Sequence, residues 1–101
     1  MRHGRRGAVP LFIVLAERAV EPAPGRSGPR LGITVSRRVG AAVERNRIKR
    51  VVREWFRRER GGLAPGVDLV VIARSAAAGC GSAELGAALT EAARRAGATR
   101  A

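Results

Sequence analysis

Hydrogen-bond donors and positive charges repeat at helical spacing in the middle of the chain. At about 100° per residue, they share one side of a helix that we expect over residues 41–60. Glu44, Glu54 and Glu59, the three acids of this stretch, lie away from the centre of that side. Guanidinium groups bind phosphates in a bidentate manner and stack on bases, so this side can bind a polyanion. The residues concerned, which we call the basic row, are Asn46, Lys49, Arg50, Arg53, Arg57 and Arg60.

A charged helix face is often simply solvated, and this alternative has to be weighed. Solvated faces usually mix the two signs of charge, because acids and bases spaced three or four residues apart stabilise the helix. The like charges at positions 49, 50, 53 and 57 repel one another, and no acid on that side relieves them. We therefore expect a polyanionic ligand, although an anionic membrane surface would also suit such a helix.

The overall charge favours the same classes of partner. The chain has 101 residues and a net charge of +12, and Lys49 is the only lysine among its 20 basic residues. Residues 26–60 contain twelve of the basic residues and three of the eight acids, so the charge is concentrated in the middle third. Such a surface attracts nucleic acids or anionic membranes.

Independent catalysis by the protein is not expected, and we assign no catalytic or metal-binding residue. A protein nuclease would need clustered carboxylates for metal ions or a histidine acid–base pair. The chain contains one histidine, His3, in a start that we expect to be mobile, and one aspartate, Asp68, at the beginning of a strand. Cys80, the single cysteine, is expected to be a free thiol in a loop with no role, which suits a reducing cytoplasm. No segment approaches the length of a transmembrane helix.

The elements that must position the basic row form one small α+β domain over residues 1–101, with a core at about 8–97. Short apolar or alternating runs predict strands, and a second apolar periodicity predicts a helix from Ser82 to Gly97. We expect an α/β sandwich of one sheet with helices packed on it, in the order β-β-α-β-α. The predicted strands are residues 11–16, 30–36 and 67–73.

The ends and the inner face of the two helices can also be predicted. Gly61 and Gly62 are expected to end the first helix, because glycine readily adopts the left-handed conformation found at helix ends. Ser82 is expected to cap the second helix with its hydroxyl group. The first helix should bury the side opposite the basic row, which carries Ile48, Val51, Val52, Trp55 and Phe56.

Residues 31–56 carry a specific pattern. A strand leads into Ser-Arg-Arg-Val-Gly at 36–40, and Arg-Asn-Arg-Ile-Lys-Arg follows at 45–50, with Arg53 one turn further. This pattern resembles the signature of the ribonuclease P protein family, and weaker similarity spans most of residues 4–97. The resemblance implies an α/β sandwich in which the basic helix forms a left-handed crossover between parallel strands, an exception to the usual handedness.

The resemblance also implies a function as the accessory subunit of a ribozyme. A catalytic RNA subunit would hold magnesium ions and remove the 5′ leader of precursor tRNA, and the protein would bind both RNAs without a cofactor of its own. No membrane and no obligate protein partner are expected, and the location would be the cytoplasm. The residues expected to contact RNA are Arg37, Arg38, Arg45, Asn46, Arg47, Lys49, Arg50, Arg53 and Arg57.

The start of the chain departs from the family pattern. Family members usually begin with a further helix that carries two phenylalanines and forms, with the sheet, a cleft for the single-stranded leader. Met1 aligns just after that helix, and we expect either a misassigned start or a true loss of the helix. The remaining cleft positions would be Phe12 and Leu15.

Two other functions stay open from the residues alone. A general RNA- or DNA-binding module of the ribosomal-protein type would share the basic helix, and the 36–50 pattern argues against it in favour of ribonuclease P. A membrane-surface protein would bind anionic vesicles but not structured RNA.

Overall fold

The structure is a computed structural model that describes residues 3–18, 29–64 and 66–99. Four strands and two α-helices follow one another in the order β-β-β-α-β-α, with a short 3₁₀ turn at 37–39, before α1. The predicted α+β class is therefore confirmed, with one strand more than expected. The elements are β1 (His3–Ala8), β2 (Phe12–Arg18), β3 (Arg30–Thr34), α1 (Ala42–Glu59), β4 (Val67–Ala73) and α2 (Ser82–Arg95).

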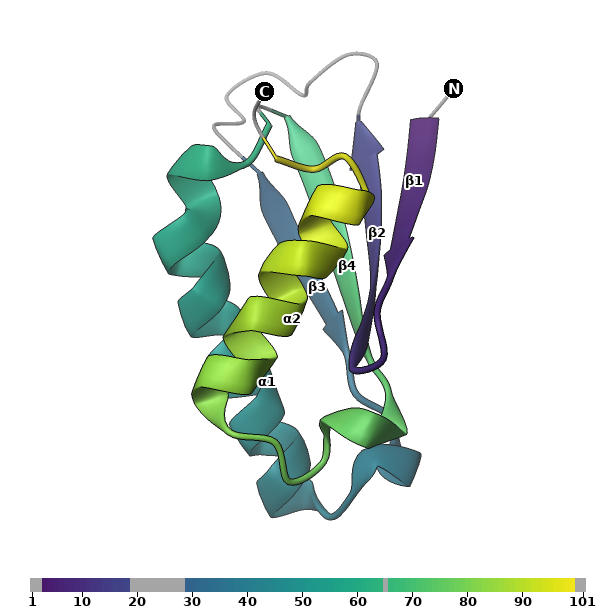
Figure 1. Cartoon of the computed structure of the whole chain (residues 1–101), viewed down its shortest axis with the longest axis vertical. Helices are drawn as coiled ribbons and strands as arrows, with labels where there is room; N and C mark the ends of the chain where they lie inside the picture. The colour runs from purple at the N-terminus through teal and green to yellow at the C-terminus, as the bar shows by residue number, and fades with distance from the viewer. Residues whose placement is uncertain (1–2, 19–28, 65, 100–101) are drawn as a thin grey trace.

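One mixed sheet forms the frame of the molecule, with the strands in the order β1-β2-β4-β3. β2 runs antiparallel to both β1 and β4, whereas β3 pairs in parallel with β4. A parallel pair needs a crossover connection, and α1 supplies it between β3 and β4, as expected. The left-handed sense of this crossover stays a prediction. In Figure 1, α2 crosses in front of the sheet and α1 lies beside it, near β3.

The helices cover one face of this sheet. On β4, Val67, Leu69, Val71 and Ala73 are buried, and the residues between them are half-buried. β2 alternates in the same way, since Phe12, Val14 and Ala16 are buried whereas the residues between them are half-buried. The period of two that predicts a strand thus separates a core face from a more open face.

The sequence does not predict the first strand, β1, and the structure places His3 in it. The segment His-Gly-Arg-Arg-Gly-Ala contains no β-branched residue, so its intrinsic preference for a strand is low. It forms a strand because it pairs with β2 through a tight connection, in which the Val9 amide donates to the Phe12 carbonyl at 2.9 Å. Gly7 also lets β1 approach α2 closely, since a Cβ atom there would lie 2.6 Å from the Ala96 nitrogen.

Two predicted helix ends differ from the structure. Among the described residues, neither Gly61 nor Gly62 has a positive φ angle, and the chain leaves α1 through a 3₁₀ turn at Arg60–Gly62. Ser82 is the first residue of α2 and not its cap, because Gly81 occupies the N-cap position and no side chain caps the helix. Gly97, with φ of 69°, follows the end of α2 as predicted.

The core lies between the sheet and the two helices, and Trp55 is its largest fully buried side chain. Ile48, Val51 and Val52 are buried with it, so α1 buries the predicted side, and Phe56 is partly buried against the same cluster. The Trp55 indole N–H donates to the Thr90 hydroxyl at 3.0 Å and so links α1 to α2. This packing fixes the rotation of α1 and turns its opposite side outward.

Candidate RNA interface

The outward side of α1 carries the basic row. Asn46, Arg50, Arg53 and Arg57 are exposed, and Lys49 is half-buried. Asn46 and Arg57 are eleven residues apart, so at about 1.5 Å per residue these side chains span about 16 Å along the helix. A shallow hollow lies on this side, lined by three of the arginines and one acid: Arg50, Arg53, Arg57 and Glu54.

The arginines at the centre of the row are not neutralised by any acid among the described residues. Within residues 3–18, 29–64 and 66–99, Arg50, Arg53 and Arg57 make no ion pair. Each pair of like charges three or four residues apart destabilises a helix by about 0.2–0.5 kcal/mol, and this side of α1 carries several such pairs. Phosphate groups placed along the row would remove that repulsion and add charge-assisted hydrogen bonds.

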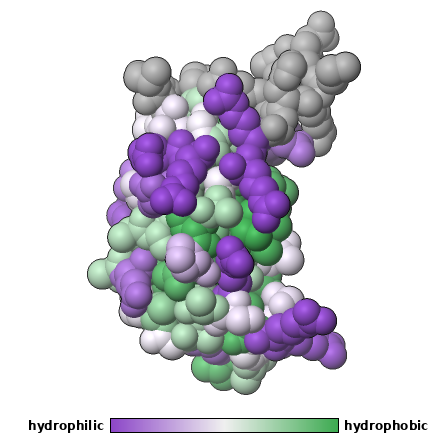
Figure 2. Space-filling model, turned by 45° about the vertical axis from the view of Figure 1, so that its right-hand side comes forward, coloured by the Kyte–Doolittle hydropathy of each residue, from purple (hydrophilic) through white to green (hydrophobic). Residues whose placement is uncertain are grey.

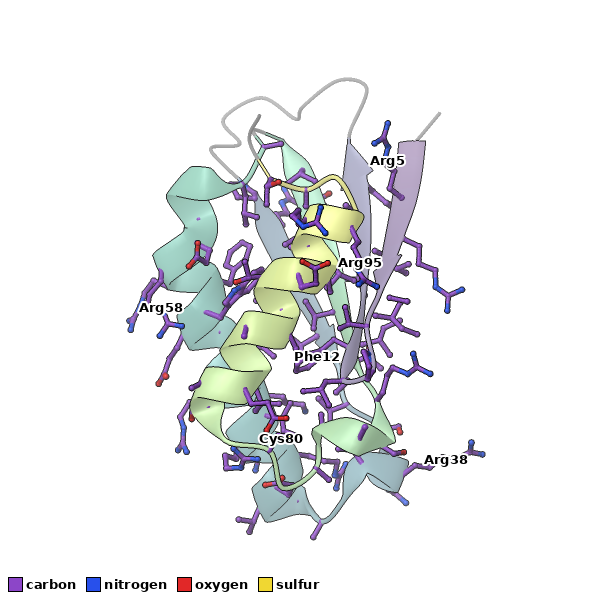
Figure 3. All side chains as sticks on the ribbon, viewed as in Figure 1. Arg5, Phe12, Arg38, Arg58, Cys80 and Arg95 are labelled. Carbon is purple, nitrogen blue, oxygen red and sulfur yellow. The ribbon has the colours of Figure 1, made fainter. Side chains whose placement is uncertain are left out.

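Arg37 and Arg38 extend the cationic surface beyond the start of α1. Both are exposed and belong to the 3₁₀ turn Arg37–Val39, which Val39 anchors by its burial in the core. Figure 3 shows Arg38 at the end of the molecule where α1 begins, pointing away from the sheet. These two arginines therefore lie in the turn directly before α1, at the end of the molecule where that helix begins.

Arg45 and Arg47 do not share the outward side of α1. Arg45 is half-buried, and its Nε atom is buried without a hydrogen-bond partner in the part of the chain that the structure describes. Arg47 is also half-buried and donates from Nε and Nη2 to the Glu44 carboxylate at 2.7 and 2.8 Å. Its Nη2 also donates to the Cys80 carbonyl at 2.8 Å. The Arg-Asn-Arg pattern thus exposes only its central residue fully.

Glu44 is held as a carboxylate by these partners. Hydrogen bonds from the Arg47 guanidinium and then from the Gly79 amide lower the pKa of Glu44 from 4.5 to about 2. The Gly79 N–H donates to Glu44 Oε2 at 2.7 Å. The pair Glu44 and Arg47 has a spacing of three residues that could have been noticed in the sequence, whereas nothing local points to Gly79 or Cys80.

The two positions predicted for a leader cleft lie on opposite faces of β2. Phe12 has no exposed surface and lies between the sheet and α2, so the prediction that it lines an open cleft is wrong. Alternation along β2 turns Leu15 to the other face, where it is half-buried beside Arg6 on β1 and Val70 on β4. Of the two, only Leu15 has a side chain that an RNA strand could reach.

A second group of arginines lies where α2 ends beside β1, and much of its charge is compensated. Arg94 and Arg95 both pair with Glu91 at 2.7 Å, and Arg95 donates to the Ala8 carbonyl at 3.0 Å. Figure 2 brings the β1 side forward and shows hydrophilic groups separated by apolar surface. This side therefore lacks the continuous cationic character of α1.

Other kinds of site find little support in the described residues. No group of His, Cys, Asp and Glu within them could hold a metal ion. No helix in the described ranges is long and apolar enough to cross a membrane. Cys80 lies in the loop before α2, as predicted, and its thiol donates to the Ala76 carbonyl at 3.3 Å. Burial raises the pKa of the Cys80 thiol, which disfavours the thiolate form.

A mixed sheet covered on one face by two helices, one of which carries the exposed basic row, defines a small α+β protein with a strongly cationic helix. The ribonuclease P family matches residues 1–97 of the chain. The chain belongs to this family.

Similar proteins agree with this assignment. The "Ribonuclease P protein component" of Syntrophus aciditrophicus is 40% identical over 74 residues, which are 72% of this chain and 57% of that protein. The protein of the same name from Desulforapulum autotrophicum is 52% identical over 56 residues, which are 55% of this chain and 48% of that protein. The chain thus spans about half the length of these curated relatives.

Solved structures of ribonuclease P proteins share the fold. The Staphylococcus aureus protein superposes with a TM-score of 0.80 at 30% identity, covering 96% of this chain and 84% of that one. The Thermotoga maritima protein gives a TM-score of 0.73 at 34% identity, covering 87% and 79%. The fold expected from the resemblance is therefore confirmed.

Proposed function

We propose that the chain is the accessory RNA-binding subunit of a ribonuclease P, and that it assists a catalytic RNA in removing the 5′ leader of precursor tRNA. The observation that carries this proposal is the basic row, whose central arginines have no ion-pair partner in the described part of the chain. Family membership supports RNA, rather than a membrane, as the polyanion.

In this proposal the side chains of the protein bind RNA, and the RNA subunit carries out the cleavage. The magnesium ions that cleavage needs would lie on the RNA, and the protein would supply neither a cofactor nor a catalytic residue. Both RNAs would be found in the cytoplasm. Exposed guanidinium groups on α1 would contact phosphates of the catalytic RNA, and Asn46 would read a base edge or a phosphate.

The proposed contact residues follow from exposure and position. The turn before α1 contributes two arginines, the first turns of α1 contribute Asn46, and the rest of the helix contributes the cations of the row. Arg45 is a lesser contact because it lies off the outward side of α1 and its Nε atom is buried. Leu15 on the open face of the sheet is the proposed contact for the leader. The main contacts would be Arg37, Arg38, Asn46, Lys49, Arg50, Arg53 and Arg57.

The salt dependence of RNA binding tests this surface. Arg50→Ala and Arg53→Ala should each weaken binding to the catalytic RNA and reduce the log–log salt slope by roughly one unit or slightly less. Arg94→Ala is the matched control, because it removes the same charge from α2 and should leave the slope unchanged. Equal slopes for the wild type and both row variants would contradict a phosphate-facing α1.

A further inference from the structure

Two hydrogen bonds join the first two turns of α1 to the loop before α2, and two more within α1 connect the side chains that make them. The Glu44 carboxylate accepts two from Arg47 and one from the Gly79 amide, and Arg47 donates the fourth to the Cys80 carbonyl. Figure 3 shows Cys80 where this loop passes α1. We call this arrangement the Glu44 clamp. It connects residues more than thirty positions apart in the chain.

The start of α1 has little else of this kind to hold it. Its N-cap residue is Ala41, which makes no side-chain capping hydrogen bond. The buried side chains of α1 begin at Ile48, so the first turn lies beyond the hydrophobic anchor. The clamp acts at this end of α1, between the buried Val39 before the helix and Ile48 within it, and Asn46 lies between its two α1 residues.

The clamp also takes Arg47 out of the cationic surface. The guanidinium group uses Nε and Nη2 for three hydrogen bonds, and an ionised carboxylate already neutralises its charge. About 27% of the Arg47 side chain and 25% of the Glu44 side chain stay exposed. A phosphate would have to break a bidentate ion pair to bind Arg47, whereas Arg50 is exposed and makes no ion pair in the described residues.

Gly79 is suited to this role by its backbone. Its φ angle of 80° is one that other residues rarely adopt, and this conformation places its N–H on the carboxylate. A Cβ atom at Gly79 would meet nothing within 4 Å, so only the backbone conformation disfavours a side chain there. A substitution at Gly79 therefore disturbs the clamp without removing a charge.

We propose that Glu44 and Arg47 are positioning residues, which fix the first turns of α1 on the Gly79–Cys80 loop so that Asn46 and Arg50 face the RNA, and that Arg47 itself makes no RNA contact. This inference rests on the proposed function, since it concerns how α1 is presented to the catalytic RNA. It differs from the expectation drawn from the family pattern, in which both arginines of Arg-Asn-Arg contact RNA.

The test measures two quantities for binding of the full chain to the catalytic RNA: the affinity at a fixed salt concentration and the log–log slope of affinity against salt. Arg47→Ala should lower affinity several-fold at fixed salt and leave the slope within about half a unit of the wild type, because no phosphate contact is lost. Arg50→Ala should lower the slope by about one unit or slightly less. Gly79→Ala should reproduce the Arg47→Ala result with every charge in place, and Gly61→Ala, in open space without a positive φ, is its control.

Two further measurements separate the clamp from a simple loss of folding. Circular dichroism should show that each variant is folded, and Glu44→Gln, which keeps an acceptor for Gly79, should retain more affinity than Glu44→Ala. A slope that falls for Arg47→Ala as much as for Arg50→Ala would overturn the inference alone. A slope unchanged in Arg50→Ala would instead refute the proposed RNA face, and the inference would fall with it.

Discussion

Replacing Trp55 tests whether the buried side of α1 has been assigned correctly. The side chain is 2% exposed, and a buried tryptophan covers about 150–250 Å², which is worth about 4–6 kcal/mol at about 25 cal/mol per Å². Trp55→Ala keeps only a small part of this burial and leaves a cavity, so we expect a loss of about 3–5 kcal/mol. A domain of this size is stable by only about 5–15 kcal/mol, so this loss is a large fraction of its total stability.

The hydrogen bond to Thr90 contributes much less than this packing. A neutral hydrogen bond contributes about 0.5–1.5 kcal/mol net, and Thr90 lies at the exposed end of this bond, where water can replace its hydroxyl group as the acceptor for the indole N–H. Thr90→Val should therefore cost less than about 1.5 kcal/mol. The two variants together distinguish burial of the ring from the polar link between the helices.

The assay is urea unfolding followed by far-ultraviolet circular dichroism, because Trp55→Ala removes the only tryptophan of the chain and its fluorescence. The loss in unfolding free energy should exceed that of Thr90→Val by at least about 2 kcal/mol. A Trp55→Ala variant that remains as stable as the wild type but loses RNA binding would refute the reasoning, since the ring would then belong to the RNA-binding side.

Two further predictions concern packing and pH. Gly7→Ala should destabilise the chain by about 1–3 kcal/mol or more, because the new methyl group would meet the backbone of α2. The same urea unfolding measures this loss. The control is Gly61→Ala, which places its methyl group in open space and should change stability little. The pKa values of Glu44 and Glu91 are both lowered from 4.5 to about 2 by hydrogen bonds, first from arginines, so their ionised forms stabilise the folded state. That stabilisation is complete above pH 4.5 and is lost as the pH falls towards 2. The unfolding midpoint of a Glu44→Gln/Glu91→Gln variant should therefore decline less steeply over this window than that of the wild type. An equally steep decline would contradict the assignment of the two carboxylates as stabilising groups.

The core and the crossover helix could be predicted from the sequence because their patterns are periodic. Leu69 and Val71 alternate with less buried residues on β4, and Trp55 repeats with Ile48 and Val52 along α1, so period and burial agree in both elements. The position of the basic row could be predicted from the same period, because the row lies on the side of α1 opposite the buried one.

The parts that could not be predicted depend on contacts distant in the chain. The residues of β1 have a poor intrinsic preference for a strand. The strand forms because it pairs with β2 and because Gly7, which has no side chain, lets it pack closely against α2. Arg47 has the spacing and charge of an RNA contact, yet the loop at Gly79 and Cys80 holds it inward. No local pattern encodes that loop's position relative to α1.

The same reason explains the two cleft residues. Phe12 and Leu15 are three apart in the sequence, and a strand turns residues at odd spacing to opposite faces. The sequence resemblance carried both positions over together, but the register with β4 places Phe12 beside Ala73 on the core side and Leu15 beside Val70 on the other.

The most direct test of the whole account is cleavage of precursor tRNA by the cognate catalytic RNA at low magnesium, with and without this chain. We predict that the folded chain accelerates release of the 5′ leader, and that an Arg50→Ala/Arg53→Ala variant needs a higher concentration for the same effect. The Arg94→Ala variant should behave like the wild type. A folded chain that leaves the cleavage rate unchanged at every concentration would contradict the central claim.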